Sequence, residues 1–311
     1  MAENTLKKHT VGWIGAGRMG YAMASRLLKA GADVSIYNRT RTKAEPLEAL
    51  GGKIVDSPAD LADRDIVFTM VGGPDDFEAV TLGPDGVLSR KGTAPNLLID
   101  CTSISEEAAA KVRAAAAKVG TKMLDAPVSG NAKVVSAGRL SIVASGARDA
   151  YDEALPYLEA LGEGVSYVGE GELARMVKIC HNIFLGVVTQ SLAEITVLAE
   201  KGGVPRHAFL DFMNKSVMGS TFTRYKTPGF VNLDLTPTFT PVLLRKDLDL
   251  GLSAARELEV PLPVASVIRE IVQTLIGHGY TDCDFAALLP LAAKAANLEL
   301  KPENIEVDSG L

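Results

Sequence analysis

The chain has 311 residues, of which 47% are hydrophobic and 23% charged, and its formal net charge is −6. This length and composition are sufficient for two domains with a sizeable core. The acidic balance, without a dense run of lysine or arginine, argues against nucleic acid or an anionic membrane surface as the main partner.

No stretch reaches the roughly 18 uninterrupted apolar residues of a membrane span, and residues 1–10 are polar without a signal core. We therefore expect a cytoplasmic protein with no membrane partner. The odd set of widely spaced cysteines fits neither a disulfide framework nor a zinc site. The four histidines show no metal-ligand spacing, so we expect no catalytic metal.

A glycine-rich motif directly follows the first apolar run, Val11–Ile14. G-x-G-x-x-G spacing permits a tight strand-to-helix turn, close approach of backbone to a pyrophosphate, and packing of a helix on a sheet. The next segment has apolar residues at helical spacing, and the free N–H groups at its start would face the phosphates. The sequence therefore predicts a dinucleotide site at Gly15, Ala16, Gly17, Arg18, Met19 and Gly20.

The end of the second predicted strand, Val34–Tyr37, indicates which dinucleotide is bound. NAD-preferring proteins usually place an Asp or Glu here for the ribose 2′-OH, whereas this chain continues Asn38-Arg39-Thr40. A guanidinium suits a 2′-phosphate, and Asn38 and Thr40 can donate to it. We expect NADP(H) to be preferred, with NAD(H) possible; the alternative interpretation is a solvated basic turn.

The rest of the first half alternates strand-like and helix-like segments, which favours a parallel sheet covered on both faces. Val71 ends one apolar run and is placed among the cofactor contacts. The expected strands are 66–71, 97–100, 123–124, 140–144 and 165–168, and the expected helices are 106–119 and 149–161. The pattern predicts an α/β fold with an N-terminal Rossmann-type doubly wound sheet.

After Gly171 the strand signals fade and long amphipathic segments follow. The expected helices are 172–201, 206–214, 241–258, 265–278 and 285–296, with a loop or substrate-facing crossing segment over 219–240 and a frayed tail over 301–311. We therefore predict two domains. Residues 1–168 form an NADP-binding Rossmann domain, and residues 169–311 form an all-helical domain for substrate binding and dimerisation.

Lys178 is the best candidate for an acid or base in hydride chemistry. Lys178 and Asn182 stand four residues apart in a predicted helix, so they share one face. A lysine beside buried surface tends to have a lowered pKa, which suits proton exchange with a hydroxyl or carbonyl oxygen. A Lys–Asn pair on a helix is usually solvated, so the pair needs supporting context.

Five motifs in order supply that context. The chain resembles the β-hydroxyacid dehydrogenases, which include 3-hydroxyisobutyrate dehydrogenases and tartronate semialdehyde reductases and are related to 6-phosphogluconate dehydrogenase. The resemblance spans nearly the whole chain. It is carried by Gly15-Ala16-Gly17-Arg18-Met19-Gly20, Asp100-Cys101-Thr102-Ser103-Ile104-Ser105, Asp125-Ala126-Pro127-Val128-Ser129-Gly130, Lys178-x-x-x-Asn182 and Leu244-Arg245-Lys246-Asp247-Leu248.

The resemblance implies an NADP(H)-dependent oxidoreductase that interconverts a small β-hydroxyacid and its semialdehyde or keto form. It makes Lys178 the general acid/base and Asn182 the residue that orients the substrate. It places the small carboxylate substrate at Ser129 and Gly130, the nicotinamide ribose at Ser103, and Lys246 over the cofactor. Homodimers or homotetramers are common in the family, and the long apolar helix fits such an interface.

One departure from the family pattern concerns the substrate pocket. Asn131 stands where a second glycine is common, so its side chain either enters the pocket or changes the local backbone. Two other functions stay open. Imine reductases or reductive aminases share the architecture but carry other residues in place of Lys178, and some relatives that lack this lysine are non-catalytic cofactor-binding oligomerisation modules.

Overall fold

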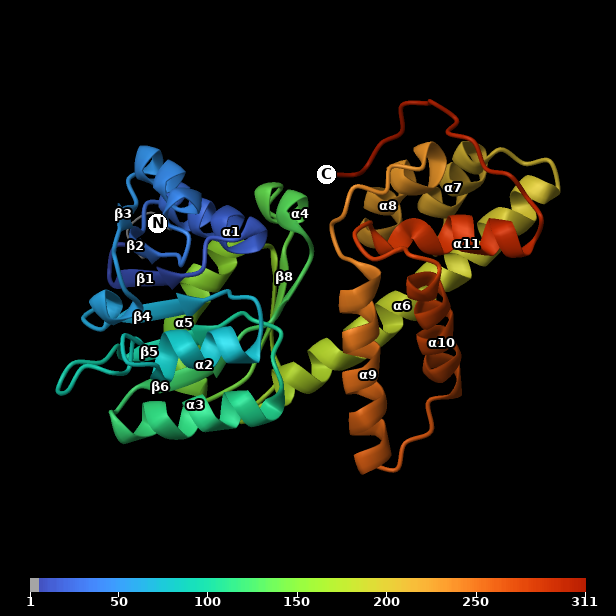
Figure 1. Ribbon diagram of the computed structural model, residues 1–311. Helices are drawn as coiled ribbons and strands as arrows, with labels where there is room; N and C mark the ends of the chain where they lie inside the picture. The colour runs from blue at the N-terminus through green and yellow to red at the C-terminus, as the bar shows by residue number, and fades with distance from the viewer. Residues whose placement is uncertain (1–5) are drawn as a thin grey trace. The chain divides into compact units, whose positions relative to one another are not determined.

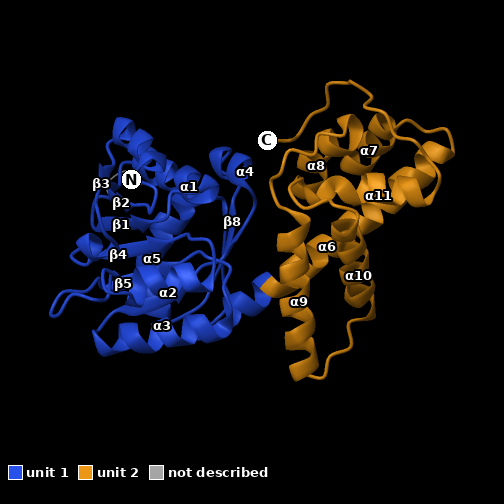
Figure 2. Cartoon of the chain, in the orientation of Figure 1, with its two compact units in different colours: residues 1–178 blue, residues 179–311 orange. Residues whose placement is uncertain are grey.

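The computed structural model describes residues 6–311 of the chain. Two compact units, residues 1–178 and 179–311, are coloured separately in Figure 2. The division falls inside α6 (Leu173–Lys201), a continuous helix, whereas the predicted boundary at 168/169 lies just before that helix.

Unit 1 is built on a parallel sheet of six strands (Figure 1). Their order is β3-β2-β1-β4-β5-β6, and each neighbouring pair runs parallel. The chain leaves β1 to one side and returns at β4 on the other, which is the switch point where Rossmann folds bind dinucleotides. The strands are β1 (Thr10–Ile14), β2 (Asp33–Tyr37), β3 (Lys53–Ile54), β4 (Ile66–Thr69), β5 (Leu97–Asp100) and β6 (Lys122–Asp125).

Both faces of this sheet are buried, because successive side chains of a strand alternate between two cores. Phe68 joins the core that contains α1 (Arg18–Lys29) and α5 (Arg148–Leu161). Its neighbour Val67 joins the core formed with α2 (Pro74–Leu82) and α3 (Glu106–Lys118). This explains why the strands are near-continuous apolar runs, and it confirms the expected doubly wound sheet.

A smaller three-stranded sheet extends unit 1 beyond β6. Its strands are β7 (Val128–Ser129), β8 (Ser141–Ala144) and β9 (Gly164–Tyr167), in that order, with the short helix α4 (Ala132–Ser136) between β7 and β8. Three 3-10 turns complete the unit at Arg41–Lys43, Glu45–Leu50 and Pro58–Leu61.

Unit 2 is helical throughout its regular structure (Figure 1). It contains the rest of α6 and then α7 (Arg206–Lys215), α8 (Thr221–Asn232), α9 (Pro241–Glu257), α10 (Pro263–Gly277), the 3-10 turn η5 (Phe285–Ala287) and α11 (Leu288–Ala295). Gly251 of α9 faces α6, where a Cβ atom would collide with Ile183. Gly186 of α6 similarly lies against Leu244 and Leu248 of α9. Gly251 thus leaves room for the Ile183 side chain where the two helices meet.

The prediction of a loop over 219–240 was wrong for its first half, which forms α8. Threonine and proline gave this segment poor helical periodicity, but Ser220 and Thr223 form a capping box at its start. Lys226 of α8 is buried, and its Nζ lies 2.5 Å from Asp284 Oδ1 and 4.2 Å from the centroid of the Phe285 ring. Tertiary burial of one face of this segment, which includes Phe230 and Val231, overrode its weak local helical propensity.

The predicted frayed tail is instead anchored. Arg206 is buried and donates to the carbonyl oxygens of Phe230 and Val231 at the end of α8 and to that of Lys301. Glu303 accepts from the backbone N–H groups of Arg206 and His207. Buried polar side chains can therefore order a segment that lacks any hydrophobic periodicity.

The helix α6 is long and apolar enough, by length and composition, to cross a membrane. Core helices of globular proteins pass the same test, and 44% of the relevant window is already buried within the chain. The exposed face of its unit 2 part carries large apolar side chains, with Phe184 66% and Leu198 72% exposed.

The Lys226–Asp284 pair yields a prediction for the stability of unit 2. Replacing Lys226 with Met should destabilise the fold by about 3–5 kcal/mol, because it leaves the Asp284 carboxylate buried without its counter-charge. Urea unfolding followed by far-ultraviolet circular dichroism measures the change. The matched control is Lys215→Met, which removes an exposed pair with Asp211 and should change little. Equal stability of the two variants would contradict this account.

Candidate functional site

The loop between β1 and α1 has the geometry expected of a dinucleotide site. Gly15 has a φ of +102°, and a Cβ atom there would collide with the carbonyl oxygen of Met70. A Cβ atom at Gly20 would collide with the carbonyl oxygen of Gly15. Both glycines are therefore required by the turn and by the packing of α1 on the sheet.

Gly17 differs from the other two glycines. Its φ is −69°, and nothing lies within 4 Å of a Cβ atom built there, so neither backbone strain nor packing requires a glycine. It is the N-cap of α1 and makes no side-chain cap hydrogen bond. Open space at Gly17 beside a helix N-terminus fits a pyrophosphate.

Two side chains of the turn after β2, those of Asn38 and Arg39, bind other groups of the protein. Asn38 Oδ1 accepts from the Ala16 N–H at 2.7 Å, and its Nδ2 donates to the Thr40 carbonyl oxygen at 2.7 Å. Arg39 is 81% exposed, and its Nη1 lies 2.8 Å from Asp76 Oδ1 at the start of α2. Asn38 thus braces the phosphate loop, while Arg39 is held at the surface by a carboxylate that is distant in sequence.

The carboxyl ends of β4 and β5 meet at the position of Val71 and Ser103. The Val71 N–H donates to Thr102 Oγ1 at 3.1 Å, and Thr102 is 2% exposed. Ser103, the next residue, is partly exposed at the same edge. The hydroxyl of Thr102, the first residue of the Thr102-Ser103 pair, therefore joins the ends of β4 and β5.

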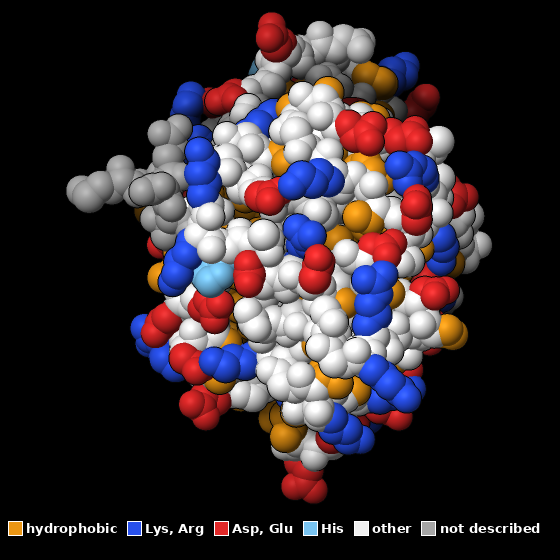
Figure 3. All heavy atoms as spheres, turned by 90° about the vertical axis from the view of Figure 1, so that its left-hand side faces the viewer, with side chains coloured by type: hydrophobic (Ala, Val, Ile, Leu, Met, Phe, Trp, Pro, Cys, Tyr) orange, Lys and Arg blue, Asp and Glu red, His pale blue; other side chains and the backbone are white. Residues whose placement is uncertain are grey.

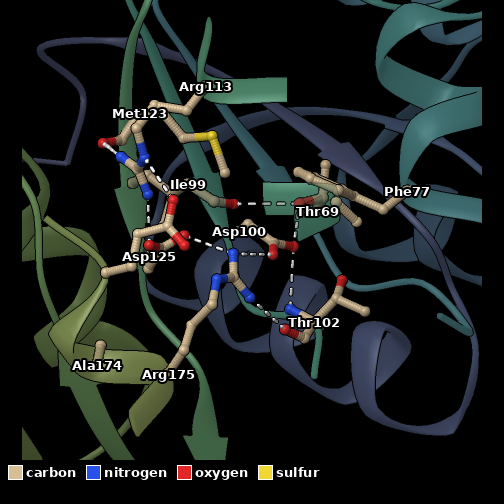
Figure 4. Close-up of polar contacts among 12 residues, drawn as sticks. Thr69, Phe77, Ile99, Asp100, Thr102, Arg113, Met123, Asp125, Ala174 and Arg175 are labelled. Atoms are coloured by element: carbon tan, nitrogen blue, oxygen red, sulfur yellow. Dashed lines mark hydrogen bonds and ion pairs between the residues drawn. The ribbon is translucent and has the colours of Figure 1, made fainter. Parts of the chain in front are cut away.

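A buried cluster of charges lies where β5 and β6 end (Figure 4). The guanidinium of Arg175, from the first turn of α6, lies between the carboxylates of Asp100 and Asp125, with N···O distances of 3.0 and 2.5 Å. Arg113 of α3 binds the other oxygen of Asp125 and reaches Glu172 at 3.3 Å. Burial raises the pKa of Asp125 to about 6, outweighing the neighbouring Arg175 and Arg113 cations.

The segment predicted to hold a substrate carboxylate follows β7. Gly130 has a φ of +139°, which favours glycine. Asn131 Oδ1 accepts from the N–H groups of Lys133 and Val134, so Asn131 is the N-cap of α4. Of the two roles considered for this departure, the structure shows the effect on local backbone. Ser129 is partly exposed beside it.

Lys178 and Asn182 lie one turn apart on α6, as predicted. Lys178 is partly exposed, whereas Asn182 is only 5% exposed. Asn182 Nδ2 donates to Asp247 Oδ2 of α9 at 2.6 Å, and its Oδ1 lies 3.0 Å from His181 Nδ1. Lys246 is exposed, with its Nζ 3.4 Å from Asp247 Oδ1. The close α6–α9 crossing thus fixes the orientation of the Asn182 amide.

Sequence reasoning missed the role of three residues. Asp76 gives no local signal, because only the fold brings α2 to the end of β2. Arg175 could have been suspected, since a cation three residues before Lys178 on an apolar helix needs a partner. Asp247 belongs to the motif that contains Lys246, but the sequence pattern suggested an exposed carboxylate and not a hydrogen-bond partner of Asn182.

Other kinds of site find little support in the described residues. Over residues 6–311, no group of three or more His, Cys, Asp or Glu side chains is arranged to hold a metal ion. Figure 3 shows one face of the molecule, where acidic and basic side chains are interspersed rather than gathered by sign.

Comparison with known proteins agrees with this class of fold and site, a Rossmann unit with NAD(P)-binding geometry followed by a helical unit. Residues 10–169 match the NAD-binding domain of 6-phosphogluconate dehydrogenase. Residues 172–292 match the NAD-binding domain of NADP-dependent 3-hydroxyisobutyrate dehydrogenase.

Individual relatives align over almost the whole chain. A glyoxylate/succinic semialdehyde reductase of Arabidopsis thaliana is 29% identical, with 92% of this chain and 80% of the relative covered. A 3-hydroxyisobutyrate dehydrogenase of Pseudomonas aeruginosa is 30% identical, with 89% and 95% covered. The crystal structure of a 3-hydroxyisobutyrate dehydrogenase from Salmonella typhimurium superposes with a TM-score of 0.80 at 28% identity, covering 91% of this chain and 99% of that one.

The chain therefore belongs to the β-hydroxyacid dehydrogenase family and is an oxidoreductase with an NAD(P)-binding domain. An imine reductase from Myxococcus stipitatus has the same fold, with a TM-score of 0.57 at 22% identity, and this likeness concerns the fold alone.

The raised pKa of Asp125 predicts a pH effect on the stability of unit 1. Because its pKa is about 6 in the folded state against an ordinary value of 3.8, folding is favoured when the group is protonated. This contribution is complete below pH 3.8 and is lost as the pH rises through about 6. The unfolding free energy of the wild type, minus that of Asp125→Asn, should fall by about 2–3 kcal/mol between roughly pH 4 and 7.

Fluorescence of Trp13, the single tryptophan of the chain, reports unfolding of unit 1 because Trp13 is buried there against Phe68. Asp63→Asn removes an exposed carboxylate and serves as the control. A difference for Asp125→Asn that stays constant or grows with pH would refute the assignment.

Proposed function

We propose that the protein is an NADP(H)-dependent oxidoreductase that interconverts a small β-hydroxyacid and its semialdehyde or keto form. The observation that carries this proposal is the presence of Lys178 and Asn182 on one face of α6, downstream of a loop whose Gly17 is left open for a pyrophosphate. Related enzymes act on 3-hydroxyisobutyrate and on glyoxylate or succinic semialdehyde, as their names state.

In this proposal the nicotinamide ring supplies or accepts the hydride when the cofactor is bound. The Lys178 Nζ takes up or returns the proton of the substrate hydroxyl as general base or acid. Asn182 orients the substrate oxygen, with its amide fixed by Asp247 at 2.6 Å. Ser129 and the backbone at Gly130 and Asn131 bind the substrate carboxylate.

The proposed cofactor contacts follow the predicted positions. The residues Gly15, Ala16, Gly17, Arg18, Met19 and Gly20 hold the pyrophosphate, Val71 and Ser103 border the nicotinamide ribose, and Lys246 contacts the cofactor. Residues 1–168 are the cofactor domain, and residues 169–311 are the substrate and dimerisation domain. We infer a homodimer or homotetramer from the exposed apolar face of α6, and we place the protein in the cytoplasm.

Replacement of Lys178 by Ala tests the acid/base role. We expect kcat to fall by about 100-fold or more, because general acid–base catalysis contributes roughly 10²–10⁴ to a rate. The dissociation constant for NADP(H) should stay nearly unchanged. Turnover is measured with 3-hydroxyisobutyrate, glycerate, tartronate semialdehyde, 4-hydroxybutyrate, serine and succinic semialdehyde, and added methylamine should partly restore it.

Lys201→Ala, at the far end of the same helix, is the control and should keep wild-type turnover. Full activity of Lys178→Ala would refute the role of Lys178. Wild-type turnover of cyclic imines but of no hydroxyacid would favour an imine reductase. Tight NADP(H) binding without any turnover would favour a non-catalytic module.

Cofactor preference is the second prediction of this proposal. The wild type should use NADP(H) with a higher kcat/KM than NAD(H), because Arg39 and Thr40 can bind the 2′-phosphate. Arg39→Ala should lower kcat/KM with NADP(H) by about 10–100-fold, the usual worth of a hydrogen bond to a charged group, and should change NAD(H) use little. Steady-state kinetics with both cofactors measure the two ratios.

Because Arg39 forms an ion pair with Asp76, a substitution of Asp76 serves as the counterpart of Arg39→Ala. Asp76→Asn removes a negative charge beside the 2′-phosphate position and should improve NADP(H) use while it leaves NAD(H) use close to wild type. Equal or better use of NAD(H) by the wild type would overturn the preference.

A further inference from the structure

The first turn of α6 is fixed to unit 1 by buried polar contacts. The Ala174 N–H donates to Ser145 Oγ at 2.9 Å, and Ser145 exchanges two backbone hydrogen bonds with Asp125 at 2.9 and 3.0 Å. One residue later, Arg175 is 5% exposed and contacts two carboxylates. The start of the helix is therefore held by directed contacts from β6 and β8 as well as by packing.

Arg175 connects several strand ends at once (Figure 4). It binds Asp125 at the end of β6 and Asp100 at the end of β5, and its Nη1 lies 3.5 Å from the Thr102 carbonyl oxygen. Asp100 in turn accepts from Thr69 Oγ1 of β4 at 2.7 Å and from the Thr102 N–H at 3.0 Å. One guanidinium thus links α6 to the edge that also carries Val71 and Ser103.

Lys178 lies three residues after Arg175 on the same helix. Residues three apart are neighbours on a helix surface, separated by about 4.5 Å along the axis. Because the Arg175 guanidinium is enclosed by two carboxylates, α6 cannot rotate or slide at this turn without separating buried charges. The position of the Lys178 backbone follows from the position of Arg175.

Attaching a helix through these charged groups costs free energy, because buried charges lose their contact with water. The cluster holds three carboxylates, Asp100, Asp125 and Glu172, against two guanidinium groups, Arg113 and Arg175. Glu172 Oε2 and Arg175 Nε are buried without a hydrogen-bond partner. Apolar side chains of similar volume often attach such elements with equal or greater stability. Directional charge pairs offer what apolar packing lacks, a specified register and rotation.

We propose that Arg175 is a positioning residue, which ties the first turn of α6 to the ends of β5 and β6 and so holds Lys178 at the nicotinamide edge of the sheet. The inference rests on the proposed function of Lys178. Arg175 acts through the helix and does not itself contact the reacting atoms.

A charge-matched pair of variants separates positioning from stability. Counted with every carboxyl group ionised, Arg175→Met leaves three carboxylates against one guanidinium, a net charge of −2 in the cluster where the wild type has −1. Adding Asp125→Asn restores −1 without restoring the tether. We expect Arg175→Met to lower both stability and kcat, the latter by about 10–100-fold, with the KM for the hydroxyacid and the dissociation constant for NADP(H) within about threefold of wild type.

The double variant should regain much of the stability, read from Trp13 fluorescence, but not the lost kcat. Arg175→Lys, which keeps one charged donor, should recover part of kcat. Arg148→Met, which removes an exposed pair with Asp152, is the control and should behave as wild type. Recovery of kcat together with stability in the double variant, or unchanged kcat in Arg175→Met, would overturn the proposal.

Hydrogen–deuterium exchange tests the role of Arg175 as a tether independently of the proposed enzymatic function. Arg175→Met and the double variant should both show at least about tenfold faster exchange in the first turns of α6, where the tether stabilises local structure, with β4 and β5 unchanged. If the wild type oxidises no hydroxyacid, the proposed function fails, and exchange still decides whether Arg175 is a tether. Unchanged exchange in an active enzyme would refute the tether alone.

Discussion

Three charged side chains, Asp100, Asp125 and Arg175, are buried where β5 and β6 end and α6 begins, and the partly exposed Arg113 and Glu172 complete the cluster that balances their charges. Asp100 and Asp125 occupy equivalent positions on adjacent parallel strands, so their carboxylates lie side by side. Two like charges at such a place are unfavourable without a cation between them. Arg175 provides that cation from the helix that leaves the sheet, and the helix that carries Lys178 starts where the charges meet.

Close backbone approach is the second constraint, and it recurs in both units. In unit 1, Gly15 and Gly20 let the start of α1 pack against the end of β1. In unit 2, Gly251 of α9 leaves room for the Ile183 side chain of α6, and Asp247 of α9 lies within hydrogen-bond distance of Asn182. In each case the missing Cβ leaves space for a neighbouring group.

Much of the fold was predictable because local patterns and tertiary structure agreed. The apolar runs of β4 and β5 and the alanine-rich α3 are consistent with burial on both sides of a parallel sheet. The helix α8 was not predictable, because it is buried against residues distant in the sequence, among them Asp284, which lies 58 residues from its partner Lys226. The anchored C-terminal segment was not predictable for the same reason. Arg206 donates hydrogen bonds to carbonyl oxygens at the end of α8 and to that of Lys301, and these residues are far apart in the sequence.

By itself the sequence determined the glycine loop, the absence of a carboxylate directly after β2, and the spacing of Lys178 and Asn182, because each depends on residues near one another in the chain. Only the tertiary structure decided which charges meet. Asp76 reaches Arg39, Asp247 reaches Asn182, and Arg175 enters between Asp100 and Asp125. Local periodicity specifies the face of a helix or strand, whereas the partner of a buried charge is specified by the path of the whole chain.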